Sequence, residues 1–216
     1  MGKYVNKECN PREFSTIVLM TYSAIVGLIH GIGEILQAGN NFNSNFFNAL
    51  DVADPNEVWH AGLPAFSLIP NFLISGIITV LIGVVIVIFA NFLINSKYFK
   101  FSPLLFIMLF LFGGGFVPPF IGIVSSTYYF IKNRSNTNSK QPSLLRKLIA
   151  KSWIYLISFL ILWLPTSWII GSVFPVFRLQ ISSVTFILFD IILPILILVA
   201  ASIKYGIVDR HEFERL

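Results

Sequence analysis

Five long apolar stretches, separated by shorter polar segments, constrain this chain more than any other feature of its sequence. They cover residues 14–37, 70–94, 103–131, 148–170 and 184–204. A helix needs about 20 residues, at about 1.5 Å each, to cross a hydrocarbon core of roughly 30 Å, so each stretch is long enough. Only 12% of the 216 residues are charged, which is about half of the roughly 25% found in a soluble domain. The sequence therefore predicts an all-α, multi-pass membrane protein with a single integral membrane domain.

The third stretch contains a segment that is unfavourable to a continuous helix. Gly113, Gly114 and Gly115 stand at its middle, and Pro118 and Pro119 follow closely. Glycine loses the most backbone entropy when it is ordered, and proline lacks an amide proton. We therefore expect the helix to break here.

The positions of the basic residues indicate what this break means. Cytoplasmic loops near the ends of spans collect Lys and Arg. If residues 103–131 enter and leave on one side, 14 of the 15 Lys and Arg share that side and Arg178 alone lies on the other. If all five stretches cross, the two sides carry 6 and 9 of them. The count favours four transmembrane helices plus one re-entrant hairpin, with both termini cytoplasmic, and leaves five transmembrane helices as the alternative.

The loops carry further signals about their surroundings. Residues 38–63 contain acidic residues but no Lys or Arg, so this loop is expected outside the cell. Within it, Ser44 followed by Phe46, Phe47 and Leu50 predicts a short amphipathic helix at the membrane interface. On the other side, residues 142–149 place basic and apolar side chains on different helical faces, which suits anionic lipids. The expected partners are thus the lipid bilayer and anionic lipids but no nucleic acid; a membrane protein partner or a homo-oligomer stays open.

Three ionisable side chains are expected within the membrane: His30, Glu34 and Asp190. Such groups cost about 2.5–3.5 kcal/mol each to insert, which makes them candidates for function. His30 and Glu34 are four residues apart and therefore share a helix face. Counting from the ends of the spans, we expect His30 about 10 Å and Asp190 about 9 Å below the outer surface. Asn71 and Arg178 can reach the same depth.

These five residues define a predicted polar layer in the outer half of the membrane. Three interpretations remain open: mutual neutralisation that locks the helices together, binding of a solute or lipid headgroup, and acid–base catalysis by His30 and Glu34. The broken helix adds a second candidate site, because transporters bind substrates at the ends of interrupted helices. Close packing of the glycines without a ligand explains the break equally well.

Motifs of soluble enzymes are absent from the sequence, and its single cysteine, Cys9, excludes a disulfide framework. Two histidines on separate elements form a weak metal pattern, so no metal and no cofactor are expected. The expected function is an outward-facing polar pocket that binds or moves a small solute or a lipid headgroup. The alternatives are a non-catalytic assembly subunit and an intramembrane isomerase or hydrolase.

Three segments carry a resemblance to known proteins: residues 30–34, 69–76 and 113–123. Together they resemble an uncharacterised family of small prokaryotic multi-pass membrane proteins, and this resemblance implies no activity. The pair formed by His30 and Glu34 is also similar to one in the emopamil-binding sterol isomerases. In that family such residues handle a proton on a buried lipid.

Overall fold

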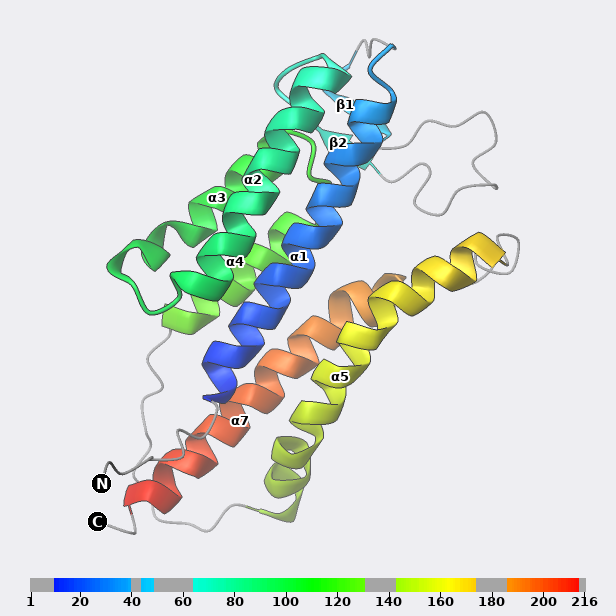
Figure 1. The fold of residues 1–216 in the computed structure, drawn as a ribbon. Helices are drawn as coiled ribbons and strands as arrows, with labels where there is room; N and C mark the ends of the chain where they lie inside the picture. Colours follow the sequence, from blue (N-terminus) through cyan, green and yellow to red (C-terminus); the bar gives the residue numbers. More distant parts are fainter. Residues whose placement is uncertain (1–9, 40–43, 49–63, 131–142, 174–185, 214–216) are drawn as a thin grey trace, which may run out of the picture.

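The described part of the chain forms six α-helices, and four helical segments within it are long and apolar enough to cross a bilayer. The structure, a computed structural model, describes residues 10–39, 44–48, 64–130, 143–173 and 186–213 (Figure 1). The helices are α1 (Pro11–Leu36), α2 (Phe72–Phe92), α3 (Ser102–Leu111), α4 (Val117–Phe130), α5 (Leu144–Val173) and α7 (Leu193–Phe213). A 3-10 helix, η1 (Lys97–Phe101), precedes α3, and a π-helix, η2 (Phe186–Ile192), precedes α7. Candidate spans within the described residues lie in α1, α2, α5 and η2–α7, which confirms the predicted fold class.

Asparagine side chains begin the first two spans. Asn10 Oδ1 accepts a hydrogen bond from the Arg12 amide at 3.0 Å, and Pro11 occupies the first helical position. Asn71 Oδ1 accepts from the Ile74 amide at 3.0 Å in the same way. Both pairings satisfy amides that lack a partner in the first helical turn.

The broken third stretch is a re-entrant hairpin. Helix α3 ends at Leu111 and helix α4 begins at Val117, so the break falls on the predicted glycines. At the start of the hairpin, the Phe99 ring lies 5.1 Å from the Tyr129 ring near its end. Arg12, in the first turn of α1, donates to the Tyr128 carbonyl at 2.8 Å. Both ends of the hairpin therefore lie at the Arg12 end of α1, and the break points toward the Gln37 end.

Helix α1 lies at the centre of the bundle and contacts α2, α4 and α7. Helix α5 packs mainly against α7, and α7 ends at the same end of the bundle at which α1 begins (Figure 1). Two apolar clusters hold these helices together. One includes Leu19, Trp153 and Ile197 from α1, α5 and α7. The other includes Met20, Ile86 and Phe106 from α1, α2 and α3.

A two-stranded sheet stands where the sequence predicts an amphipathic helix. Strand β1 (Phe46–Asn48) pairs antiparallel with β2 (Pro64–Phe66), with Phe46 opposite Phe66. The helix prediction from Ser44, Phe46, Phe47 and Leu50 is wrong over the described part of that segment. Adjacent side chains point to opposite faces of a strand, so Phe46 packs on Phe66 while Phe47 reaches Phe72. The two aromatic residues are therefore used on two faces rather than along one helical stripe.

This sheet covers the break of the hairpin. The Leu68 amide, just beyond β2, donates to the Leu111 carbonyl at 3.0 Å. Around it lie four rings that we call the aromatic cover. Phe46 stacks with Phe116 at 6.2 Å, and Phe66 stacks with Phe110 at 5.6 Å. The Gln37 end of the hairpin is thus closed by residues of the segment between α1 and α2.

Candidate functional site

His30 and Glu34 lie one helical turn apart on the buried face of α1. Their exposed fractions are 5% and 0%. The neighbouring Leu36, by contrast, is 77% exposed. This arrangement is consistent with the prediction from the sequence that the two polar residues share a helix face.

The break of the hairpin packs directly onto these two side chains. A Cβ atom at Gly113 would lie 2.6 Å from the Glu34 carboxyl carbon, and one at Gly115 would lie 2.8 Å from His30 Cε1. The structure therefore brings together the two features that the sequence presents separately, the acid–histidine pair and the glycine segment. Only residues without a side chain allow the backbone to approach so closely.

The glycines also supply backbone conformations that other residues rarely adopt. Gly113 has a φ of 107° and Gly115 a φ of 76°. Gly114, between them, donates its amide to the Leu109 carbonyl at 2.8 Å. Pro118 and Pro119 follow within the first turn of α4, where a helix makes no use of their missing amide protons. Together these residues end one helix and begin the next within a few positions.

The carbonyl groups at the end of α3 find partners outside the helix. Phe112, its C-cap residue, accepts a hydrogen bond from the Ser75 hydroxyl at 2.8 Å and another from the Thr79 hydroxyl. Backbone at membrane depth needs such partners because lipid supplies none. Ser75 and Thr79 therefore satisfy the interrupted hairpin from the facing helix α2.

Glu34 is left without a comparable partner. Neither of its carboxyl oxygens makes a hydrogen bond within the described part of the chain, and His30 Nδ1 makes none either. The Ser75 hydroxyl lies within hydrogen-bonding reach of the Glu34 carboxyl, although no contact between the two groups has full hydrogen-bond geometry. Burying a polar group without a partner costs about 1–3 kcal/mol, and more for a charged one. The site thus holds three polar atoms whose hydrogen-bonding capacity is unused by the described residues.

Helix ends add fixed partial charges on either side of the pair. The C-terminal end of α3, which carries partial negative charge, lies at Phe112 beside Ser75 and Thr79. The N-terminal end of α4, which carries partial positive charge, follows Gly115 on the side of His30. The site is therefore more negative near Glu34 and less so near His30.

Of the remaining members of the predicted polar layer, Asn71 and Asp190 form hydrogen bonds with other groups. Asn71 caps α2, and Arg178 lies outside the described residues. Asp190 Oδ1 accepts a hydrogen bond from the Tyr22 hydroxyl at 2.7 Å. Tyr22 precedes His30 by two turns of α1, about 12 Å at 1.5 Å per residue. Asp190, which lies in η2, therefore meets α1 near the middle of that helix rather than at the level of His30.

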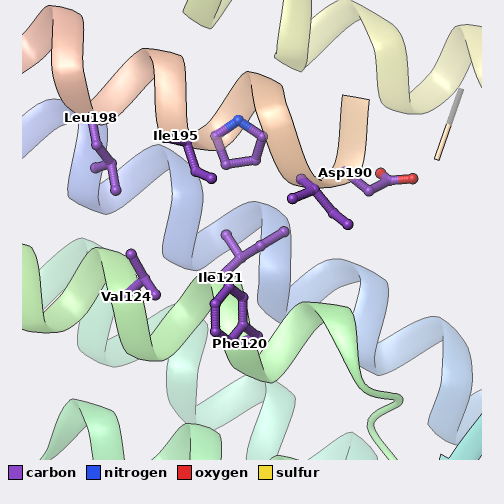
Figure 2. A pocket seen from close by; sticks show the side chains of 8 residues that line it. Phe120, Ile121, Val124, Asp190, Ile195 and Leu198 are labelled. Atoms are coloured by element: carbon purple, nitrogen blue, oxygen red, sulfur yellow. The ribbon is translucent and has the colours of Figure 1, made fainter. Parts of the chain in front are cut away.

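A small groove lies next to Asp190, between α4 and α7 (Figure 2). Asp190 stands at one end of it and Leu198 at the other, with Phe120 and Ile121 of α4 opposite. Its cavity volume is about 20 Å³, which is room for about one water molecule. Neither His30 nor Glu34 lines this groove, so it is separate from the pair that they form.

Ser75 and Thr79 were not among the site residues predicted from the sequence. Both are fully buried, and they are four residues apart in a span that is otherwise almost entirely apolar. That spacing places two hydroxyl groups on one face of α2, and it could have identified them as residues that face another polar group. The Phe112 carbonyl carries no such signal, because any residue supplies a carbonyl.

Groups of three or more potential metal-ligating side chains from His, Cys, Asp and Glu are absent from the part of the chain that the structure describes. Comparison with known proteins found no matching protein family, no matching curated protein and no matching solved structure. The site itself is thus the basis for a functional hypothesis.

Proposed function

We propose that this protein binds and moves a small polar solute at an intramembrane site made by His30 and Glu34 beneath the break of the hairpin. One observation carries the proposal: the Glu34 carboxyl is fully buried and neither oxygen has a hydrogen-bond partner among the described residues. A group of this kind destabilises a membrane protein. A ligand that pairs with the carboxyl group would offset this cost.

The broken hairpin supports the same proposal. Interrupted helices in transporters offer their ends and unwound carbonyls to a substrate near the middle of the membrane. Here the end of α3 and the start of α4 meet at Gly113 and Gly115, against Glu34 and His30. A helix-locking role for the pair would require mutual hydrogen bonds, which Glu34 lacks within the described residues.

The enclosure of the site favours a small solute over a lipid headgroup. Glu34 lies between the hairpin and Gly76 of α2, whose added Cβ would lie 3.0 Å from Glu34 Cβ. The aromatic cover closes the Gln37 end of the hairpin. With the termini in the cytoplasm, as the basic residues indicate, this end faces outward. Exchange with the outside then requires the aromatic cover to move.

Carbodiimide labelling tests the proposal on the purified protein. Dicyclohexylcarbodiimide is an apolar reagent that modifies protonated carboxyl groups, so Glu34 should react and Glu34→Gln should lose the modified peptide in mass spectrometry. A panel of solutes is then tested for protection: Na⁺, K⁺, ethanolamine, choline, acetate and glucose. Protection of Glu34 by at least one of them, in wild type and in Asp190→Asn, is expected.

The helix-locking interpretation gives a different result. In that case no solute protects Glu34, and Glu34→Gln changes the stability of the protein without changing uptake of any solute into proteoliposomes. That combination would overturn the proposal.

A further inference from the structure

We infer that the solute held at this site is a single monovalent cation of about the size of Na⁺. The inference rests on the proposed function and names its ligand. The coordinating oxygen atoms belong to four groups on three helices: the carboxyl of Glu34, the hydroxyls of Ser75 and Thr79, and the carbonyl of Phe112.

These oxygen atoms are gathered in one place. The Phe112 carbonyl is contacted by both hydroxyl groups, with Ser75 Oγ at 2.8 Å. Glu34 lies against Gly113, the next residue in the chain, and against Gly76, the residue that follows Ser75. Carboxylate, hydroxyl and carbonyl oxygens are the ligands that hard cations prefer. Unwound carbonyls and the C-terminal ends of half-helices coordinate Na⁺ in transporters.

The hydrogen bonds of Ser75 allow the Phe112 carbonyl to be released for a cation. Ser75 Oγ lies 2.7 Å from Ser67 Oγ as well as 2.8 Å from the Phe112 oxygen. Its single hydroxyl proton can therefore turn from the carbonyl to Ser67, which frees a lone pair of the Phe112 oxygen. No movement of the backbone is needed for this exchange.

The balance of charge favours a monovalent cation over other ions. Glu34 supplies one negative charge, so one positive charge makes the site neutral, whereas a divalent ion would leave a net charge within the membrane at high cost. The negative end of α3 at Phe112 attracts a cation and repels an anion. His30 lies against Gly115, at the start of α4. Its nitrogen atoms are not among the proposed ligands, which are all oxygen atoms.

The test is the thermal stability of the purified full chain in detergent, measured with increasing NaCl against choline chloride at constant ionic strength. A ligand that binds the folded state raises the unfolding midpoint in a saturable manner. Wild type should therefore be stabilised by Na⁺ and not by choline. Glu34→Gln should remain folded, since Gln can donate to a carbonyl, and should lose the Na⁺ dependence.

Four further variants separate the effect of coordination from that of packing. Thr79→Val removes the hydroxyl at constant shape and should weaken the apparent affinity for Na⁺ by about tenfold or more, whereas Thr79→Ser retains the oxygen and should keep the response. Asp190→Asn removes a membrane carboxyl outside the site and should leave the response intact. The Glu34→Asp variant keeps the charge at a shorter reach and should respond only at higher Na⁺ concentrations.

Each other outcome has a definite meaning. Equal effects of Na⁺ and choline on wild type, or an unchanged Na⁺ response in Glu34→Gln, would overturn the inference. If Na⁺ has no effect but another solute protects Glu34 from carbodiimide, the inference fails and the proposed function stands. If acid alone stabilises wild type and the effect depends on Glu34, the ligand is a proton and the Na⁺ site is rejected. If no ligand protects or stabilises, both proposals fail.

Discussion

The carboxyl carbon of Glu34 lies 2.6 Å from the position that a Cβ atom would occupy at Gly113. Helix α1 and the re-entrant hairpin are thereby joined through a contact that only glycine permits. The same contact brings a carboxyl group whose oxygens make no hydrogen bond of full geometry within the described residues against interrupted backbone. Because the two residues are in contact, substitution of either one should change the effect that substitution of the other has on stability.

The first prediction concerns Gly113→Ala. A non-glycine residue in the left-handed region costs about 1–2 kcal/mol, and the φ of 107° at Gly113 requires that region. The new Cβ also displaces Glu34, which adds to the loss. We expect the free energy of unfolding in detergent to fall by about 2–4 kcal/mol. In a Glu34→Ala background, Gly113→Ala should lower the free energy of unfolding only by the backbone cost of about 1–2 kcal/mol.

The control for this prediction is Gly39→Ala. Gly39 has no heavy atom within 4 Å of an added Cβ, so the substitution should leave stability almost unchanged. If Gly113→Ala is as stable as Gly39→Ala, then the Glu34 contact and the backbone conformation at Gly113 are both incorrect.

The second prediction concerns Gly76, at the crossing of α1 and α2. A Cβ at this position would lie 2.6 Å from the Gly31 carbonyl oxygen. A backbone atom cannot rotate away as a side chain can, so the helices must separate. We expect Gly76→Ala to lower the free energy of unfolding by about 1–3 kcal/mol, as measured by unfolding in mixed micelles.

Gly206→Ala provides the matched control on another helix. Nothing lies within 4 Å of an added Cβ there, and alanine is favoured over glycine in a helix by about 1 kcal/mol. This variant should be as stable as wild type or slightly more stable. A loss at position 206 equal to that at position 76 would mean that the crossing is less tightly packed than the structure indicates.

The sequence allowed the spans and the break to be predicted because both depend on local chemistry. Apolar length predicts a span, and Gly113 to Gly115 with the following prolines interrupts a helix wherever it lies. The pairing of these glycines with His30 and Glu34 could not be predicted in this way. It depends on how far the hairpin enters the bundle, which is decided by packing such as that of Leu109 against Gly27.

Depth estimates from the ends of spans do not say which residues of different helices lie at one level of the bundle. They assume that all helices start at one level, and Asp190 shows why this fails. It lies in η2 and accepts a hydrogen bond from Tyr22 in the middle of α1, so its distance from the start of its own stretch does not give its level relative to His30. The contribution of Ser75 and Thr79 was missed for a related reason. The role of a hydroxyl group in a span depends on which group of another helix it faces, and the sequence does not give that.

The third prediction concerns the partner of Asp190. A hydrogen bond between helices in a membrane contributes about 0.6 kcal/mol on average and up to about 1.7 kcal/mol. A double-mutant cycle of Tyr22→Phe and Asp190→Asn should give a coupling in this range, because the Tyr22 hydroxyl donates to Asp190 at 2.7 Å. A cycle of His30→Ala and Asp190→Asn should be additive, as expected for residues more than about 7–10 Å apart. Coupling confined to the His30 cycle would contradict the structure.

The fourth prediction concerns the sides of the membrane. In a Cys9→Ser background, cysteines are placed at Tyr98 and Leu144, which are exposed at the Arg12 end of the bundle, and at Leu68, which is exposed at the Gln37 end. Because 14 of the 15 basic residues lie on one side of a four-span topology, that side should be the cytoplasm. An impermeant thiol reagent should therefore label position 68 in intact cells and label positions 98 and 144 only after lysis.

Since the hairpin returns to its side of entry, positions 98 and 144 must respond alike. Labelling of one of them without the other would mean that residues 103–131 cross the membrane, and the contact of Gly113 with Glu34 would then need a different explanation.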